Sequence, residues 1–238
     1  MDNINSNIIN VSDISRLRMQ TDGEGVTTLV VSVGCPLRCA YCINPFTWDG
    51  TCEKSKKFTP EELFEVLKID ELYFLASGGG VMFGGGEPLL NYEFISEFID
   101  KYKSRGWKFY METSLSVPLN NLKKVADKID MFFVDTKDMD KKRYEIYTRG
   151  DYDLFIGNLK YLVDTLGPEK IIARVPVIPL LHKDKEYEEN VKALQNMGIK
   201  RIDVFRYVYP ESRKSLSKTA LERREEFEEC LKKEKYID

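Results

Sequence analysis

The chain has 238 residues, of which 42% are hydrophobic and 32% charged. This balance is typical of a soluble globular protein with one sizeable core. The formal net charge is -3, from 36 basic and 39 acidic residues, and neither half is strongly basic, so we expect no nucleic-acid partner. No apolar run approaches the roughly 18 to 20 residues of a membrane span, and residues 1–10 do not resemble a secretory signal. We therefore expect a cytoplasmic protein with no membrane partner.

Strand-like and helix-like segments alternate from about residue 27 onward. Residues 1–26 are expected to form an irregular N-terminal extension that could include a short hairpin. Apolar, β-branched strands are expected at Thr27–Val33, Gly80–Phe83, Lys108–Met111, Met131–Val134, Ile171–Ile178 and Arg201–Val208. Helical spacing is found at Pro60–Phe74, Tyr92–Arg105, Asn120–Lys128, Tyr152–Leu166 and Glu186–Met197, with a last helix at about Lys218–Lys233.

Strands that alternate with helices indicate βαβ units and a parallel α/β sheet. Six such units fit a barrel with fewer than eight strands, and a doubly wound open sheet is the alternative. We expect one domain over 1–238, with an extension at 1–26, a barrel core at 27–210 and a C-terminal helix within 211–238. That helix is dense in both charge signs, which indicates a solvated face.

Three of the five cysteines, Cys35, Cys39 and Cys42, stand within one short loop after the first expected strand. Clustered cysteines in a reducing compartment are more often metal ligands than disulfides. Three thiolates can hold three irons of a cubane cluster and leave the fourth iron open to a substrate. The alternative is a structural zinc site or an electron-carrier cluster with four protein ligands, for which Cys52 is a candidate; Cys230 lies in the charged terminal helix and looks unrelated.

The spacing C-x3-C-x-aromatic-C, with Tyr41 as the aromatic residue, resembles the motif of the radical S-adenosylmethionine (SAM) superfamily. The resemblance extends to the family of pyruvate formate-lyase activating enzyme, which activates glycyl radical enzymes. It covers roughly residues 20–210. The segments that carry this closer resemblance are Asn44, Thr47-Trp48-Asp49 and the run Ser77–Val81 that leads to Gly85-Gly86-Glu87-Pro88.

The resemblance implies a partial (β/α)6 barrel and an oxygen-sensitive 4Fe–4S cluster on the three cysteines. SAM would chelate the open iron, and one electron would break a carbon–sulfur bond to give methionine and a 5′-deoxyadenosyl radical, which abstracts a hydrogen atom. A glycyl radical enzyme is then the implied partner, with a flavodoxin- or ferredoxin-type electron donor. Only Cys52 lies between Cys42 and Gly78, so the chain has no ferredoxin-like insert and is of the compact type.

Gly85, Gly86 and Glu87 follow the second expected strand, where glycines let a backbone approach a ligand closely. The resemblance implies that they meet the SAM amino group and that Tyr41 is among the SAM-binding residues; a common glycine-rich turn is the alternative. Arg174 interrupts an apolar strand, so it should face a wet or anionic lumen. The resemblance places it near the adenosyl end of SAM, and a structural ion pair is an equally good reading.

Acidic residues end the third and fourth expected strands. An acid such as Asp135, directly after an apolar run, is costly to bury unpaired and points to a cation, a lysine or a ligand; a helix cap is the alternative. The resemblance implies that Glu112 and Asp135 help to bind a monovalent cation beside the SAM carboxylate. It also implies that Lys137 contacts SAM and that Thr113 matches a family threonine, while Glu112 stands where the family usually has Asp.

Three segments depart from the family pattern. Asp22-Gly23-Glu24-Gly25 resembles an Asp-Gly-Pro-Gly segment where the glycyl peptide docks, but it has Glu24 for proline and could be a plain turn. Ile43 follows the third cysteine, where well-known members have histidine. Arg206-Tyr207-Val208 stands where Pro-Tyr-His is common, and the only histidine, His182, is expected on the surface of a loop.

These departures leave SAM cleavage intact and leave the substrate open. The first hypothesis is an enzyme that installs a glycyl radical on a partner. The second is a radical SAM enzyme that modifies a peptide or a small molecule, and the missing histidine and the altered Asp22 segment motivate it. The third is not an enzyme but an iron–sulfur carrier or a zinc-binding module, for which the acids at the strand ends would have no use.

Overall fold

A computed structural model describes residues 7–19, 22–49, 52–178, 180–182, 186–206 and 218–234. Its centre is one eight-stranded sheet in the order β3-β1-β2-β4-β5-β6-β7-β8. The parallel strands are β2 (Val26–Ser32), β4 (Gly80–Gly85), β5 (Lys108–Thr113), β6 (Met131–Asp135), β7 (Ile171–Val177) and β8 (Arg201–Arg206). They confirm the six predicted strands; Tyr207 and Val208, predicted at the end of the last one, lie outside the described residues.

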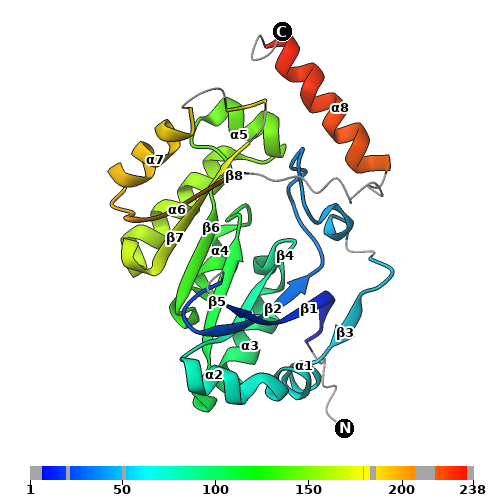
Figure 1. The fold of residues 1–238 in the computed structure, drawn as a ribbon, viewed down its shortest axis with the longest axis vertical. Helices are drawn as coiled ribbons and strands as arrows, with labels where there is room; N and C mark the ends of the chain where they lie inside the picture. The colour runs from blue at the N-terminus through cyan, green and yellow to red at the C-terminus, as the bar shows by residue number, and fades with distance from the viewer. Residues whose placement is uncertain are drawn as a thin grey trace.

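The order of the parallel strands decides between the two predicted architectures. From β2 to β8 the strands follow one another in sequence order without a reversal, whereas a doubly wound sheet reverses its order at a switch point. Right-handed crossovers between strands in such an order put every helix on the same face of the sheet. The sheet is therefore an open, partial (β/α)6 barrel, as predicted (Figure 1).

The N-terminal extension is more regular than predicted. β1 (Ile9–Met19) pairs antiparallel with β2, and β3 (Lys56–Phe58) pairs antiparallel with β1 at the edge of the sheet. The expectation of an irregular segment is thus wrong for residues 9–19, and the hairpin is longer than foreseen. Register shifts at residues 11–13 and 15–18 break the alternation of buried and exposed side chains that identifies a strand in a sequence.

The α-helices are α1 (Pro60–Leu67), α2 (Glu71–Ser77), α3 (Tyr92–Tyr102), α4 (Leu119–Lys123), α5 (Lys141–Thr148), α6 (Tyr152–Leu166), α7 (Glu186–Asn196) and α8 (Lys218–Lys233). Short 3-10 helices are η1 (Pro45–Thr47), η2 (Lys68–Asp70), η3 (Pro88–Asn91), η4 (Lys103–Arg105), η5 (Ala126–Lys128) and η6 (Pro168–Lys170). The single helix predicted from Pro60 is interrupted by η2. Its predicted start is confirmed, because Thr59 and Glu62 form a reciprocal capping box.

The sheet has two apolar faces. The outer face packs against the helices around residues such as Phe83, Phe98 and Phe109, which form the main core. A smaller cluster of Met82, Tyr110 and Phe133 fills the opposite, inner face. The inner face thus keeps its carboxyl end for polar side chains, which is where a β/α barrel places its active site. Among the described helices, none is long and apolar enough to cross a membrane.

Candidate functional site

The loop that leaves β2 brings the three cysteines to the carboxyl end of the sheet. All three thiols are free; Cys39 is buried and Cys35 and Cys42 are half-buried. Burial raises the pKa of each thiol, to about 12 for Cys39, and repulsion between neighbouring thiolates adds to the effect for Cys35. A group that withdraws negative charge from the sulfur atoms, as a metal does, is therefore the natural partner for this loop.

Main-chain hydrogen bonds fix the cysteine loop on two sides. The amide of Gly34 donates to the Thr47 carbonyl at 2.7 Å, so the chain folds back through η1 onto the start of the loop. The amide of Ala40 donates to the Tyr147 carbonyl at 3.0 Å, and that of Arg38 to the Thr148 carbonyl at 2.8 Å. The middle of the loop is thereby anchored to the end of α5, a helix that the sequence analysis did not predict.

The glycine turn after β4 lies directly against the cysteine loop. The amide of Glu87 donates to the Gly34 carbonyl at 2.7 Å, and that of Gly86 donates to the Ser32 carbonyl at 2.9 Å. A Cβ atom on Gly86 would overlap the carbonyl oxygen of Gly34, and Gly85 has a φ of 106°. The close approach of the two loops therefore depends on glycine at position 86.

The carboxylate of Glu87 is fully buried between the glycine turn and the end of β5. It accepts hydrogen bonds from the Thr113 hydroxyl at 2.7 Å, the Ser114 amide at 2.8 Å and hydroxyl at 2.6 Å, and the Leu89 amide at 3.1 Å. Burial raises the pKa of Glu87, against the effect of these donors. The side chains of Glu87 and Thr113 thus bind each other and tie β4 to β5, so a ligand would meet this turn through its backbone.

Asp135 and Lys137 lie at the end of β6, within electrostatic reach of the cysteine loop. The Lys137 ammonium is 2.8 Å from Asp135 Oδ2. The backbone of Lys137 has a φ of 57°, in the left-handed region, which is a strained conformation for a residue with a side chain. Burial alone would lower the pKa of Lys137, but attraction by Asp135 and by the Cys39 thiolate raises it well above its usual value. Lys137 in turn favours the thiolate forms of Cys39 and Cys42.

Arg174 on β7 is the centre of a second charged group in the lumen. Its guanidinium is 2.5 Å from Glu112 Oε1 and 3.9 Å from carboxylate oxygens of Asp22 and Asp203, and it lies 5.3 Å from the centre of the Phe133 ring. Burial opposes its charge, but the surrounding carboxylates raise the pKa of Arg174. The ion pair predicted as one alternative for Arg174 is thus present. Its partner is Glu112, the acid that the resemblance places beside a monovalent cation.

The segment that contains Asp22 is packed into the inner face of the sheet. The Asp22 side chain is buried and forms a two-point ion pair with Arg18, one bond of which measures 3.0 Å. A Cβ atom on Gly23 would stand 2.8 Å from the Tyr110 ring, and the Tyr110 hydroxyl donates to the Glu24 carbonyl at 3.2 Å. Asp22 is thus held inside the protein, while Glu24 in the same turn is exposed.

His182 is buried, so its predicted place on the surface is wrong. Only 1% of its side chain is exposed. Its Nε2 lies 2.7 Å from Asp138 Oδ2, and its Nδ1 accepts a hydrogen bond from the Ile178 amide at 3.0 Å. Asp138 is wholly buried and also accepts a bond from Arg143 at 3.0 Å, so the histidine serves to satisfy a buried acid. Nothing in the sequence around His182 indicates that its side chain binds a buried acid, because Asp138 is 44 residues away.

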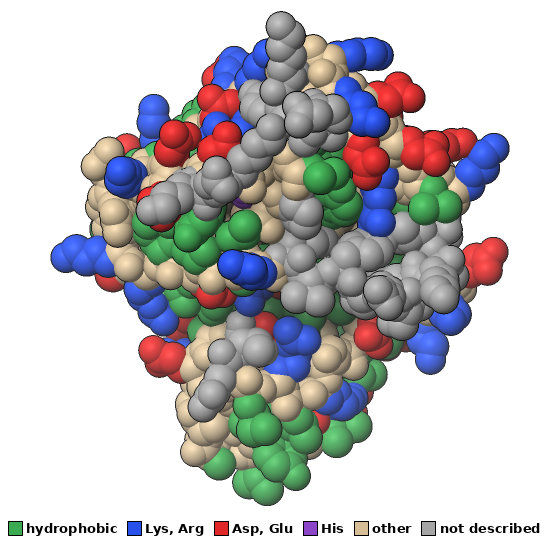
Figure 2. Space-filling view, turned by 45° about the horizontal axis from the view of Figure 1, so that its top comes forward, with side chains coloured by type: hydrophobic (Ala, Val, Ile, Leu, Met, Phe, Trp, Pro, Cys, Tyr) green, Lys and Arg blue, Asp and Glu red, His purple; other side chains and the backbone are tan. Residues whose placement is uncertain are grey.

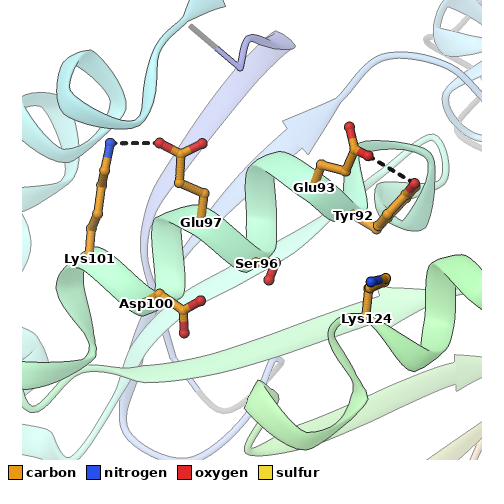
Figure 3. Close-up of a pocket in the computed structure, with 7 residues that line it drawn as sticks. All are labelled: Tyr92, Glu93, Ser96, Glu97, Asp100, Lys101 and Lys124. Atoms are coloured by element: carbon orange, nitrogen blue, oxygen red, sulfur yellow. Dashed lines mark hydrogen bonds and ion pairs between the residues drawn. The ribbon is translucent and has the colours of Figure 1, made fainter. Parts of the chain in front are cut away.

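Two cavities lie outside the lumen. One, of about 700 Å³, borders the cysteine loop and η1, with Arg38, Trp48 and Cys52 in its wall. The other, of about 520 Å³, is a shallow groove on α3, where Figure 3 shows Glu97 paired with Lys101. Glu93 in its wall is also bonded to the Tyr92 hydroxyl, and the groove lies on the helical side of the barrel.

Exposed apolar side chains form a further surface feature. They are Ile69, Leu72, Tyr73 and Leu75, on η2 and α2. On the face drawn in Figure 2, hydrophobic side chains gather at the lower edge, while acidic and basic side chains are interspersed elsewhere. Because α2 leads into the amino end of β4, this patch is remote from the cysteine loop.

The donor set suits a cubane cluster. Within the described ranges, no three His, Cys, Asp or Glu side chains are arranged around a point where one metal ion could be held. A cubane does not require such convergence, because each of its irons takes one cysteine. Three free thiols on one short loop, beside a glycine turn and a lysine, therefore fit a 4Fe–4S cluster with one open iron.

Comparisons with known proteins agree on one family. The sequence model of the radical SAM superfamily matches residues 29–221. The pyruvate formate-lyase-activating enzyme of Clostridium pasteurianum is 35% identical over 176 residues, which cover 74% of this chain and 71% of that protein. The (2S)-3-sulfopropanediol dehydratase activating enzyme of Klebsiella oxytoca is 28% identical, with 68% of this chain and 69% of that protein covered.

Solved structures resemble the fold. SuiB of Streptococcus suis has a TM-score of 0.58 at 15% identity, with 85% of this chain and 45% of that chain covered. TYW1 with a lysine-pyruvate adduct has a TM-score of 0.54 at 16% identity, with 85% of this chain and 73% of that chain covered. At such low identity, these likenesses show the fold alone.

Proposed function

The chain belongs to the radical SAM superfamily, and from that premise we propose that it cleaves SAM reductively and installs a glycyl radical on a partner enzyme. The observation that carries the proposal is the junction of the cysteine loop with the turn Gly85–Glu87 at the carboxyl ends of β2 and β4. Similarity to activating enzymes, including that of 4-hydroxyphenylacetate decarboxylase from Clostridioides difficile (strain 630) at 28% identity, supports the choice of partner.

Cys35, Cys39 and Cys42 would hold the 4Fe–4S cluster of this family. When bound, the cluster supplies the single electron that breaks a carbon–sulfur bond of SAM, giving methionine and a 5′-deoxyadenosyl radical. The cysteine loop sets the position of this chemistry through its bonds to η1 and α5. The backbone of Gly85 and Gly86 offers polar groups to the SAM amino group at the same edge.

Charged side chains of the lumen would bind the rest of SAM. We assign Lys137 to the SAM carboxylate, because its ammonium is 2.8 Å from Asp135 and acts electrostatically on Cys39 of the cysteine loop. Arg174 is assigned to the adenosyl end. Thr113 and Tyr41 remain predicted contributors, although the Thr113 hydroxyl is bonded to Glu87 and the Tyr41 ring packs against Phe227.

We also propose a monovalent cation beside Glu112 and Asp135. In this structure the Arg174 guanidinium already lies at Glu112, so a cation would have to displace or share that carboxylate. Replacing sodium and potassium by a bulky organic cation should raise the KM for SAM. An unchanged KM would show that Arg174 and Lys137 balance these acids without a metal ion.

The remaining assignments concern the setting of the reaction. We propose a flavodoxin- or ferredoxin-type electron donor, a cytoplasmic location and one radical SAM domain over 1–238. A peptide or small-molecule substrate is the second candidate function. The burial of Asp22 favours it, because the carboxylate is engaged by Arg18 and Arg174 and is not presented to a docking peptide. Family membership and the six βα units disfavour a zinc module or a simple electron carrier.

The test of partner choice is electron paramagnetic resonance after anaerobic incubation with SAM, a reductant and a glycyl radical enzyme encoded beside this chain. We expect the doublet of a glycyl radical on the partner, absent with the Cys42→Ala variant and absent when the partner's radical glycine is replaced by alanine. If 5′-deoxyadenosine accumulates with a short peptide or metabolite and no such doublet forms, the second candidate function replaces the first.

A further inference from the structure

The terminal helix α8 packs directly on the cysteine loop, although its charge pattern predicts a solvated helix. That expectation is wrong for one face, whose buried residues recur every three or four positions: Ala220, Arg223, Phe227 and Leu231. Phe227 lies edge-on to the rings of Tyr41 and Tyr147, each at 5.8 Å. Leu37, Cys39 and Ala40 belong to the same apolar cluster, so one face of α8 forms part of the wall around the cysteines.

Arg223 joins this helix to two other elements through backbone carbonyls. Its Nε donates to the Arg38 carbonyl at 2.8 Å, directly before Cys39 in the loop. One of its terminal nitrogens donates to the carbonyls of Ile146 at 2.5 Å and Tyr147 at 3.0 Å, in the last turn of α5. A planar guanidinium can make such a set of bonds in fixed directions, whereas a lysine ammonium cannot. Arg223 therefore fixes the loop relative to α5.

The charge of Arg223 is costly in this position. The residue is 5% exposed, and burial together with repulsion by Arg149 lowers its pKa, although an arginine stays protonated. Its hydrogen bonds go to neutral carbonyls, and the nearby acid Glu226 offsets its charge only in part. The bond to the Arg38 carbonyl places this positive charge one residue from Cys39 in the loop. Negative charge on a cluster held at Cys39 would stabilise this buried cation.

Arg224 repeats the arrangement more weakly at the next position of the loop. Its Nε donates to the Ala40 carbonyl at 3.2 Å, and its guanidinium lies 5.0 Å from the centre of the Tyr41 ring. Two adjacent arginines of α8 thus bind the carbonyls on either side of Cys39. Both arginines thus bind residues of the cysteine loop that are far from them in sequence, 185 residues away for Arg223 and 184 for Arg224.

We propose that Arg223 is a positioning residue of the cluster site, which holds the cysteine loop against α5 and supplies a permanent positive charge that raises the reduction potential of the cluster. Net charge and hydrogen bonding around a cluster are among the factors that set its potential. The inference rests on the proposed 4Fe–4S cluster but not on the identity of the partner enzyme. It adds α8 to the machinery that would deliver the electron to SAM.

The test compares Arg223→Gln, Arg223→Lys and the control Lys232→Gln, an exposed charge lost from the same helix. Full chains are loaded anaerobically with iron and sulfide. Two quantities are measured: the half-life of the cluster under an iron chelator, and its midpoint potential from a titration followed by electron paramagnetic resonance. The glutamine variant removes both the positive charge and the planar set of N–H donors. The lysine variant keeps the charge and removes only the planar set of donors, so the two effects are separated.

We expect Arg223→Gln to lose iron about tenfold faster, because removing a residue that orients metal ligands typically lowers metal affinity by about tenfold or more. At a fixed applied potential its ratio of reduced to oxidised cluster should fall up to about tenfold, a negative shift of up to about 59 mV for one electron. Arg223→Lys should lose iron faster than the wild type but keep its potential. Lys232→Gln should match the wild type in both measurements.

Equal half-lives in the wild type and Arg223→Gln would overturn the positioning role, and equal potentials would overturn the electrostatic role. If Arg223→Gln does not fold, Arg224→Gln replaces it, with smaller changes expected in the same directions; no change in either quantity would overturn the inference. A wild-type chain that takes up no SAM-responsive cluster would contradict the proposed function itself. A wild type that does so, with unaltered variants, would remove only the role of Arg223.

Discussion

At the ends of β2 and β4, the cysteine loop and the glycine turn are joined through main-chain atoms, whereas around β5, β6 and β7 the lumen is held by side-chain ion pairs. The first region needs the absence of a side chain at Gly86. The second needs a balance of charge between Arg174, Lys137 and the carboxylates near them. The main-chain region suits a cluster held in one fixed place, because its geometry leaves little freedom, while the ion-pair region supplies the charged groups assigned to the two ends of SAM.

The largest effect is expected from Gly86→Ala, which attacks the main-chain region. The added methyl group would overlap the Gly34 carbonyl, and we expect a loss of about 3 kcal/mol of folding free energy together with loss of the cluster. Gly157→Ala is the matched control: nothing lies within 4 Å of a Cβ there, and a helical glycine replaced by alanine should add about 0.5 to 1 kcal/mol. Denaturant unfolding and iron content measure both; equal stability changes would contradict the account.

Glu87→Gln tests how firmly the glycine turn is tied to β5. Each carboxylate oxygen of Glu87 accepts a bond from a backbone amide, so either orientation of a glutamine amide sets its NH2 group against an N–H. We expect a loss of about 2 kcal/mol in the free energy of unfolding. Chemical denaturation of the apo-protein measures it, and a change near zero would mean that the turn is held by its backbone bonds alone.

A double-mutant cycle on Glu112 and Arg174 tests the ion-pair region. Arg174→Gln leaves partly buried acids without their cation and should cost about 2 kcal/mol, less than for a fully buried pair, since about a fifth of each side chain is exposed. Adding Glu112→Gln should recover about 1 kcal/mol of that loss. Additive effects would show that the two residues do not act as a pair.

The smallest effect is expected at the groove on α3. Lys101→Ala removes ion pairs to Glu61 and Glu97, all of them well exposed, and should change the free energy of unfolding by less than about 1 kcal/mol. Cluster content and SAM cleavage should equal those of the wild type. A loss of activity in this variant would contradict an active site at the carboxyl ends of the strands and would indicate one on the helical side of the barrel.

The features that follow local rules were predictable from the sequence. Strands of β-branched residues and helices with aliphatic spacing are identified by their period, and the predicted bounds Tyr152–Leu166 and Lys218–Lys233 are those of α6 and α8. The order of the motifs along the chain also predicted that the cysteine loop, the glycine turn and the acid Asp135 would lie at one end of the sheet, since parallel strands share that end.

The features that depend on distant contacts were not predictable. α5 buries Arg143, Tyr144, Tyr147 and Thr148 and so lacks an aliphatic stripe. Arg223 looks like one more charge of a solvated helix, because its partner in the loop is 185 residues away. His182 is buried only because Asp138 is buried beside it. In each case a polar side chain is placed by a partner that the local sequence does not contain.

The most direct test of the account is the yield of 5′-deoxyadenosine from the anaerobically reconstituted chain with SAM and dithionite, compared with Cys35→Ala. The wild type should form product and the variant none above background, because the variant lacks one of the three thiolates on which the cluster depends. Equal yields from the two proteins, or no product from a wild type that carries a full cluster and its substrate, would contradict it.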